Sequence, residues 1–189
     1  MGRVVVSQFV SVDGVMEDPG GSEGWDRGGW VFQFDQGEEG SKFKLDEVMG
    51  AGALLLGRTT YAGFAEAWPS REGDFADKFN TMPKYVVSTT LSDPGWNNST
   101  VIGDDLEGRI GALSEEVEGD ILVNGSAQLV HALAVANLVD EYRLMVFPLV
   151  LGGGKRLFGD SPAPATFALE SSRPVGPDGV VILTYRAKS

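Results

Sequence analysis

The chain has 189 residues, enough for one domain with a substantial core, and its 42% hydrophobic and 22% charged residues are typical of a globular protein in water. Fifteen basic and 27 acidic residues give a formal net charge of −12, which disfavours nucleic acid and anionic membrane surfaces as partners. The absence of cysteine excludes disulfides, thiol nucleophiles and cysteine-ligated zinc.

The first element predicted along the chain is a strand, because Val4 to Val10 is an apolar run rich in β-branched residues. The run ends in S-V-D-G, residues 11–14, and Asp-Gly is a strong turn signal. On this pattern alone, Asp13 does no more than shape a turn.

A long irregular stretch follows, from Met16 to about Gly40, in which glycines are interleaved with Trp25, Trp30 and Phe32. Structureless loops of this length inside compact domains are usually functional or disordered, and disordered linkers are poor in Trp and Phe. We therefore interpret the stretch as a flap or wall over a pocket. The alternative is a loop that packs its aromatic side chains on the core or on a second subunit.

The stretch around which the chain is organised is Ala53 to Tyr61, A-L-L-L-G-R-T-T-Y. It predicts a strand buried on both faces, a glycine turn and a helix that reaches about Trp68, with Thr59 or Thr60 capping its first turn. A helix N-terminus presents free N–H groups and a positive dipole end, which suit a phosphate, and Arg58 could hold a second phosphate. The alternative is an ordinary turn with a surface arginine.

Short helices are predicted on either side of this stretch, at residues 41–49 and 74–81, from their apolar spacing. Tyr85 to Ser88 then predicts a strand that ends in three hydroxyl residues, Ser88, Thr89 and Thr90. Open α/β sheets place ligand contacts at the carboxyl ends of parallel strands. Serine and threonine are also common in loops, so both interpretations remain open here.

A second unit of strand, turn and helix repeats the pattern. Ile121 to Val123 predicts a buried strand, N-G-S at residues 124–126 a turn, and Ala127 to Leu138 a helix. Ser126 is a candidate N-cap, and Gly125 would let a ligand approach the backbone. Two such turns on neighbouring strands could hold the two ends of one dinucleotide.

The remaining elements are predicted to be strands. Asp140 to Leu151 is a long apolar strand interrupted by Pro148, and a G-G-G-K-R-L-F loop follows at residues 152–158. Strands at 166–169 and 179–185 have no helix between them and should pair antiparallel. The sequence thus predicts a single α/β domain over residues 1–189, with a mostly parallel central sheet, helices on both faces and a C-terminal antiparallel hairpin.

Several chemistries are disfavoured by missing patterns. The single histidine, His131, has no neighbouring carboxylate and no G-x-S-x-G turn is present, which argues against a Ser-His-Asp hydrolase. One histidine, no cysteine and no D-x-D-type loop argue against a dedicated metal site. Arg156 breaks the P-loop pattern after Lys155, and Leu157 replaces the last glycine of a G-x-G-x-x-G that starts at Gly152. A bound dinucleotide would therefore lie outside the Rossmann scheme.

The N-terminal residues lack a long apolar run and a processing site. No stretch of the sequence reaches the length that spans a membrane. We therefore expect a cytoplasmic protein whose partner is a small molecule rather than a nucleic acid or a membrane.

A set of motifs in order along the chain resembles the dihydrofolate reductase-like superfamily, closest to the branch that includes the reductase domain of the riboflavin-biosynthesis deaminase-reductase. The motifs, which together cover nearly the whole chain, are S-V-D-G (11–14), L-L-L-G-R-T-T-Y (54–61), P-K-Y-V-V-S-T-T-L (83–91), V-N-G-S (123–126), L-V-D-E-Y (138–142) and P-L-V-L-G-G-G-K-R-L-F (148–158). Each motif is weak alone, and together they are specific for the family but not for a substrate. The resemblance implies the three-layer dihydrofolate reductase-like fold.

The resemblance also implies an NADPH-dependent reductase that transfers hydride to a small heterocyclic, pteridine- or pyrimidine-like, or carbonyl substrate. Carried over by position, Arg58 would contact the adenosine 2′-phosphate, with Ser88 and Thr89 as a second contact. The pyrophosphate and the rest of the cofactor would be held by a larger set, which comprises Thr59, Thr60, Gly125, Ser126 and Gly153.

Catalytic residues are less clearly implied. The carboxylate that holds the pterin in dihydrofolate reductases has no clean match among Asp35, Glu38, Glu39 and Asp46. The resemblance favours Asp13 instead, as a substrate hydrogen-bond acceptor or proton-relay partner, with Trp30 and Phe32 on the substrate side. Family analogy further implies a homodimer. The alternative function is an NADP(H)-binding sensor or interaction module with little or no catalysis.

Overall fold

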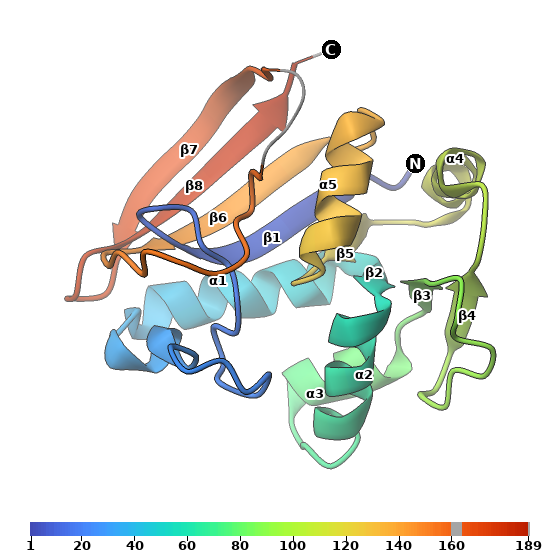
Figure 1. Cartoon of the computed structure of the whole chain (residues 1–189), viewed down its shortest axis with the longest axis horizontal. Coiled ribbons are helices and arrows are strands. Elements are labelled where there is room, and N and C mark those ends of the chain that lie inside the picture. Colours follow the sequence, from blue (N-terminus) through green and yellow to red (C-terminus); the bar gives the residue numbers. More distant parts are fainter. Residues whose placement is uncertain (160–163, 189) are drawn as a thin grey trace.

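The computed structural model describes residues 1–159 and 164–188, and an eight-stranded sheet forms its centre (Figure 1). The strand order is β4-β3-β2-β5-β1-β6-β8-β7. In chain order the strands are β1 (Val4–Ser11), β2 (Ala51–Gly57), β3 (Lys84–Val87), β4 (Ser99–Ile102), β5 (Asp120–Val123), β6 (Glu141–Phe147), β7 (Phe167–Val175) and β8 (Val180–Ala187).

The sheet is parallel from β4 through to β6, and β8 runs antiparallel to both β6 and β7. The mostly parallel sheet and the C-terminal antiparallel hairpin that the sequence predicted are therefore confirmed. The chain places β5 between β1 and β2, so the two units of strand, turn and helix lie on neighbouring strands.

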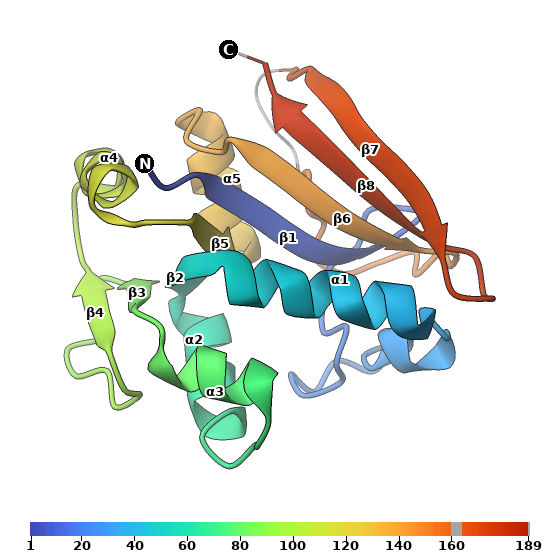
Figure 2. The ribbon, with the colours of Figure 1, turned by 180° about the vertical axis from the view of Figure 1, so that it is seen from behind.

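Helices cover both faces of the sheet. They are η1 (Trp30–Gln33), a 3-10 helix, and α1 (Gly37–Gly50), α2 (Arg58–Ala67), α3 (Asp74–Thr81), α4 (Leu106–Glu116) and α5 (Ala127–Val135). Apolar side chains of α4 and α5 pack in one core cluster, and those of α1, α2 and α3 pack in a second cluster. Figure 1 shows α5 in front of the sheet, and Figure 2 shows α1 across the opposite face.

Strand β2 shows why an unbroken apolar run predicts a central strand. Leu55 packs in the cluster of α4 and α5, whereas Leu54 and Leu56 pack in the cluster of α1 to α3. All three side chains are fully buried. Because alternate residues face opposite sides of a sheet, a strand with helices on both sides carries no polar alternation.

Several predicted boundaries were wrong. Helix α1 begins at Gly37 rather than residue 41, α5 ends at Val135 rather than Leu138, and β6 ends at Phe147. The predicted strand end at Leu151 fails because Pro148 has no N–H group to continue a ladder.

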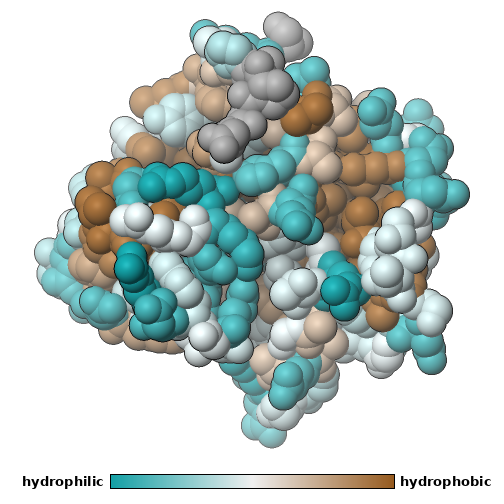
Figure 3. Space-filling view, in the orientation of Figure 1, coloured by the Kyte–Doolittle hydropathy of each residue, from teal (hydrophilic) through white to brown (hydrophobic). Residues whose placement is uncertain are grey.

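The space-filling view shows apolar surface between hydrophilic side chains on the front face (Figure 3). The predicted homodimer stays a prediction.

Candidate functional site

Two turns meet at the carboxyl edge of the sheet, where β2 and β5 end side by side. The main-chain N–H of Gly57 donates to Oγ of Ser126 at 2.9 Å. The main-chain N–H of Ser126 donates to Oγ1 of Thr60 at 3.0 Å. The turns at 57–60 and 124–126, which the sequence singled out separately, therefore form one hydrogen-bonded unit.

Neither helix that leaves this unit has a side-chain cap. Gly57 is the N-cap of α2, and Ser126 occupies the N-cap of α5 with φ 60°. The predicted capping by Thr59 or Thr60 was wrong, because Thr60 lies inside the helix and its hydroxyl faces the other turn. Ser126 does occupy the predicted N-cap position of α5, but its hydroxyl donates to the carbonyl of Asn124 at 3.1 Å instead of accepting from the helix. Both helix starts thus keep N–H groups without a side-chain acceptor, an arrangement that favours an anion.

Gly125 is required by the contact between the turns. Its φ is 56°, and a Cβ built on it would lie 2.8 Å from Oγ1 of Thr60. Gln8 of β1 fixes the same residue, since its side-chain amide donates to the carbonyl of Gly125 at 2.9 Å and accepts from its N–H at 3.0 Å. Sequence reasoning missed Gln8, although a glutamine inside an apolar strand was a usable signal.

Basic and hydroxyl side chains flank the paired turns. Arg58 and Thr59 are exposed, and Arg58 makes no ion pair or hydrogen bond with any residue that the structure describes. Strand β3 pairs with β2, which brings the end of β3 next to this turn. There Ser88 accepts from the N–H groups of Thr90 at 3.2 Å and Leu91 at 3.0 Å, and Thr89 is exposed. Arg58, Ser88 and Thr89 therefore lie along one edge of the sheet, and their contact with a shared ligand stays a prediction.

Asp13 connects the end of β1 to the loop after β6. One carboxylate oxygen accepts from Oγ of Ser11 at 2.6 Å and from the N–H of Leu151 at 3.1 Å, and the other accepts from the N–H of Gly152 at 2.9 Å. The Ser11 hydroxyl, more than these amides, lowers the pKa of Asp13 to about 2. Asp13 is thus an ionised acceptor at neutral pH. Its contact with a substrate stays a prediction.

The predicted flap is an ordered loop that packs on the loop after β6. Asp18 is 1% exposed, and its carboxylate accepts from the N–H groups of Glu23 at 2.9 Å and Trp25 at 3.1 Å. Glu17 accepts from the N–H of Lys155 at 2.9 Å and lies 2.9 Å from its ammonium group. The 152–158 loop therefore supports the 16–40 stretch, and Gly153 lies half-buried within it.

The two aromatic residues assigned to the substrate side lie in opposite environments. Trp30 is fully buried, its ring N–H donates to the carbonyl of Glu17 at 2.9 Å, and its ring packs 5.4 Å from that of Phe147. Its assignment to a pocket wall is corrected, since the side chain belongs to the core. Phe32 is 79% exposed, and its contact with a substrate stays a prediction.

A polar cluster under α1 was missed in the sequence. Ser7 of β1 donates to Oε2 of Glu47 at 2.9 Å, and the Lys44 ammonium lies 2.6 Å from both Ser7 Oγ and Glu47 Oε2. The side-chain amide of Asn124 donates to the carbonyl of Ser7 at 3.1 Å, next to the 124–126 turn. The Lys-Glu spacing of three on a helix was a usable signal, but only the fold sets Ser7 opposite it.

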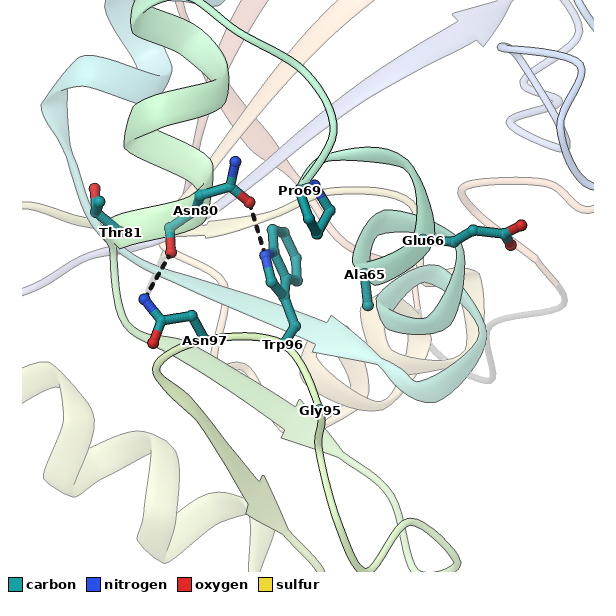
Figure 4. Close-up of a pocket in the computed structure, with 8 residues that line it drawn as sticks. All are labelled: Ala65, Glu66, Pro69, Asn80, Thr81, Gly95, Trp96 and Asn97. Atoms are coloured by element: carbon teal, nitrogen blue, oxygen red, sulfur yellow. Dashed lines mark hydrogen bonds between the residues drawn. The ribbon is translucent and has the colours of Figure 1, made fainter.

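A cavity of about 650 Å³ lies elsewhere, between the ends of α2 and α3 and the 95–97 segment (Figure 4). Trp96 donates through its ring N–H to Oδ1 of Asn80 at 2.8 Å across it. Beside it the ammonium of buried Lys84 donates to three carbonyls, and burial lowers its pKa to about 8. Since α2 starts at the paired turns and this cavity lies at its far end, we place the candidate site at the turns.

No group of three or more His, Asp or Glu side chains is placed to hold a metal ion within residues 1–159 and 164–188. No helix in this part of the chain combines the length and apolar character needed to cross a membrane.

Several known proteins resemble this chain in sequence or in fold. The chain is 27% identical over 188 residues to the uncharacterized protein YyaP of Bacillus subtilis, with 97% of this chain and 94% of YyaP covered. A putative riboflavin biosynthesis protein from Shewanella sp. PV-4 superposes with a TM-score of 0.79 at 21% identity over the full length of both chains.

Dihydrofolate reductase from Enterococcus faecalis, solved as a complex with NADP(H), superposes with a TM-score of 0.63 at 14% identity, over 100% of this chain and 98% of that one. The fold is therefore dihydrofolate reductase-like. The family model of the RibD C-terminal domain matches residues 3–181. The chain accordingly belongs to the RibD C-terminal domain family.

Proposed function

We propose that the protein is an NADPH-dependent reductase that transfers hydride to a small heterocyclic, pteridine- or pyrimidine-like, or carbonyl substrate. The observation that carries the proposal is the hydrogen-bonded pair of turns, in which two helix starts without side-chain caps meet beside an exposed arginine. Membership of the RibD C-terminal domain family supports a reductase-type activity.

The residues at the turns fit a phosphorylated dinucleotide. The N–H groups in the first turns of α2 and α5 suit the pyrophosphate, together with Thr59, Thr60, Gly125 and Ser126. The contact of the Gly125 backbone with Thr60 leaves no room for a side chain, as a site of close backbone approach requires.

The far end of the cofactor would lie at Arg58. Its guanidinium, with the hydroxyls of Ser88 and Thr89, presents donors that suit the dianionic 2′-phosphate and distinguish NADPH from NADH. In a chain of net charge −12, a cation at a helix start that has no ion-pair partner among the described residues is a local exception that an anionic ligand would use. Gly153 is assigned to the other half of the cofactor.

The bound cofactor supplies the hydride, and the chain's own residues bind, orient and exclude water. Asp13 is proposed to accept a hydrogen bond from the substrate, since its charged state suits an acceptor and not a proton donor. A homodimer in the cytoplasm completes the proposal.

Thermal unfolding with NADPH and with NADH tests this function. A ligand at ~100 times its dissociation constant stabilises the folded state by ~2.7 kcal/mol. We expect the larger shift with NADPH, and a loss of about 10- to 100-fold in NADPH affinity for Arg58→Ala. Arg186→Ala is the matched control, because Arg186 pairs with Glu170 on the distant β8–β7 hairpin. No shift with either cofactor would overturn the proposal.

The alternative function is an NADP(H)-binding sensor or interaction module on the same fold. Asp13 already accepts hydrogen bonds from the N–H groups of Leu151 and Gly152. These bonds give Asp13 a purely structural role, and this favours the alternative without catalysis. Oxidation of NADPH with dihydrofolate, menadione and alloxan as acceptors separates the two functions. Cofactor binding without turnover of any acceptor would favour the sensor.

A further inference from the structure

The polar cluster under α1 lies directly behind the paired turns. Ser7 and Gln8 are consecutive on β1, so their side chains point to opposite faces of the sheet. Gln8 holds the carbonyl and N–H of Gly125, whereas Ser7 contacts Lys44 and Glu47 on α1. Ser7, the neighbour of Gln8 on β1, therefore contacts a lysine and a carboxylate on the face of the sheet opposite to Gly125.

Lys44 is directed inwards, unlike the other lysine of its helix. Its side chain is 14% exposed, compared with 71% for Lys42, which pairs with Asp46 at the surface. Its ammonium contacts Ser7 Oγ and Glu47 Oε2, each at 2.6 Å, and lies 5.2 Å from the centre of the Phe9 ring. An ammonium group has three N–H bonds. The third has no hydrogen-bond acceptor among the described residues.

The other ionisable groups near this edge are poor proton donors. Hydrogen bonds lower the pKa of Asp13 to about 2, so it has no proton to give at neutral pH. The Lys155 side chain is 56% exposed and its ammonium pairs with Glu17 at 2.9 Å at the surface, where it exchanges protons with water. Nε2 of His131 lies 3.0 Å and 2.9 Å from two carbonyl oxygens and is occupied by them. Guanidinium groups do not release protons in proteins.

We propose that Lys44 is the catalytic acid that protonates the substrate during its reduction, an inference that rests on the proposed function. The substrate is then a compound with a polar C=O or C=N bond. Its carbon takes the hydride with its electron pair from the nicotinamide, and the π pair moves to the oxygen or nitrogen. That atom forms a bond to a proton as an Nζ–H bond of Lys44 breaks. The products are the reduced substrate, oxidised nicotinamide and a neutral amine, which regains its proton from water.

Ser7 and Glu47 act as positioning residues for this ammonium. The Glu47 side chain is 3% exposed and its Oε1 has no hydrogen-bond partner among the described residues. Arg143 lies 3.9 Å from that oxygen and is itself held by Asp120 at 2.7 Å. A buried carboxylate of this kind fixes the direction of Lys44, because its alternative is an uncompensated buried charge.

Five variants of the full-length protein test the inference by NADPH oxidation with dihydrofolate, menadione and alloxan. Lys44→Met removes the acid, and Lys44→Ala removes it and leaves space for a small amine. Lys44→Arg keeps the charge beside Glu47 but has no proton to release at neutral pH. Lys42→Met is the matched control on the same helix. Lys44→Met/Glu47→Gln removes both charges, so that a folded protein is available if the single variant unfolds.

We expect kcat to fall by about 10²- to 10⁴-fold in every Lys44 variant, including Lys44→Arg, while Lys42→Met keeps the wild-type kcat. Methylamine should restore turnover to Lys44→Ala, an effect that a structural lysine would not show.

The outcomes separate the two proposals. If the wild type shows no thermal shift with NADPH, or reduces none of the three acceptors, the reductase function fails and the inference with it. If the wild type binds NADPH and turns over an acceptor but Lys44→Arg retains wild-type kcat, only the assignment of Lys44 is overturned.

Discussion

The main-chain N–H of Ser126 donates a hydrogen bond of 3.0 Å to Oγ1 of Thr60, and this bond joins the first turn of α2 to the start of α5. The reciprocal bond from Gly57 to the Ser126 hydroxyl closes the pair. The two helix starts are thereby held together before any ligand arrives. A site assembled in advance loses less conformational freedom on binding, which favours affinity.

Thr60→Val should destabilise the ligand-free protein. Valine keeps the shape of threonine but leaves the partly buried N–H of Ser126 without an acceptor, at a cost of about 1–3 kcal/mol. Urea unfolding without cofactor measures the loss. Thr59→Val is the control, since Thr59 is exposed and makes no hydrogen bond within the described residues, and it should stay within about 0.5 kcal/mol of the wild type. Equal effects in both variants would contradict the role of the Thr60 hydroxyl.

Gly125→Ala should destabilise the protein, whereas Gly63→Ala should stabilise it. Gly125 has φ 56° and its Cβ would lie 2.8 Å from Thr60 Oγ1, so alanine costs at least about 1–2 kcal/mol there. Gly63 lies inside α2 with open space around its Cβ position, and alanine gains about 0.5–1 kcal/mol in a helix. Thermal unfolding of the two variants side by side checks the signs. A stable Gly125→Ala would show that the turns move apart easily.

Asp13→Asn should reduce stability in a pH-dependent manner. The folded pKa, about 2, lies below the ordinary value of 3.8, so the charged carboxylate stabilises the folded state at neutral pH. This contribution is present above about pH 4 and is lost as the pH falls through about 2.

Unfolding of the wild type and Asp13→Asn between pH 7 and pH 2 is the measurement. The difference in stability should be largest at neutral pH and shrink towards pH 2. Asp93→Asn, at an exposed aspartate, should follow the wild-type curve throughout. A gap between wild type and Asp13→Asn that is the same at all pH values would show that the charge of Asp13 contributes nothing.

The parts of the fold that were predictable are those with local causes. Both faces of β2 are covered by helices, so consecutive residues of the strand must all be apolar, and Leu54 to Leu56 show this run directly in the sequence. The C-terminal hairpin follows from two strand patterns joined by a Pro/Gly turn, which leaves no room for a crossover helix. The residues of the two turns were likewise visible, since glycine and hydroxyl residues follow each strand directly.

The details that failed depend on partners distant in sequence. The hydroxyl of Thr60 faces Ser126, 66 residues away, so a rule for local capping assigned it to the wrong acceptor. Trp30 and Phe32 are two residues apart with similar composition around them, yet only contact with Phe147 decides which one is buried. The sequence gives no sign of the role of Lys44 for the same reason, since its ammonium contacts Ser7 in another element.

The late insertion of β5 between β1 and β2 has a consequence for synthesis of the chain. Until residues 120–123 are made, β1 and β2 cannot reach their final neighbour, and each leaves a strand edge without a hydrogen-bonded partner. The nascent chain therefore exposes both edges from the completion of β2 at residue 57 until β5 ends at residue 123, which is about a third of its translation, and an open strand edge can pair with another chain.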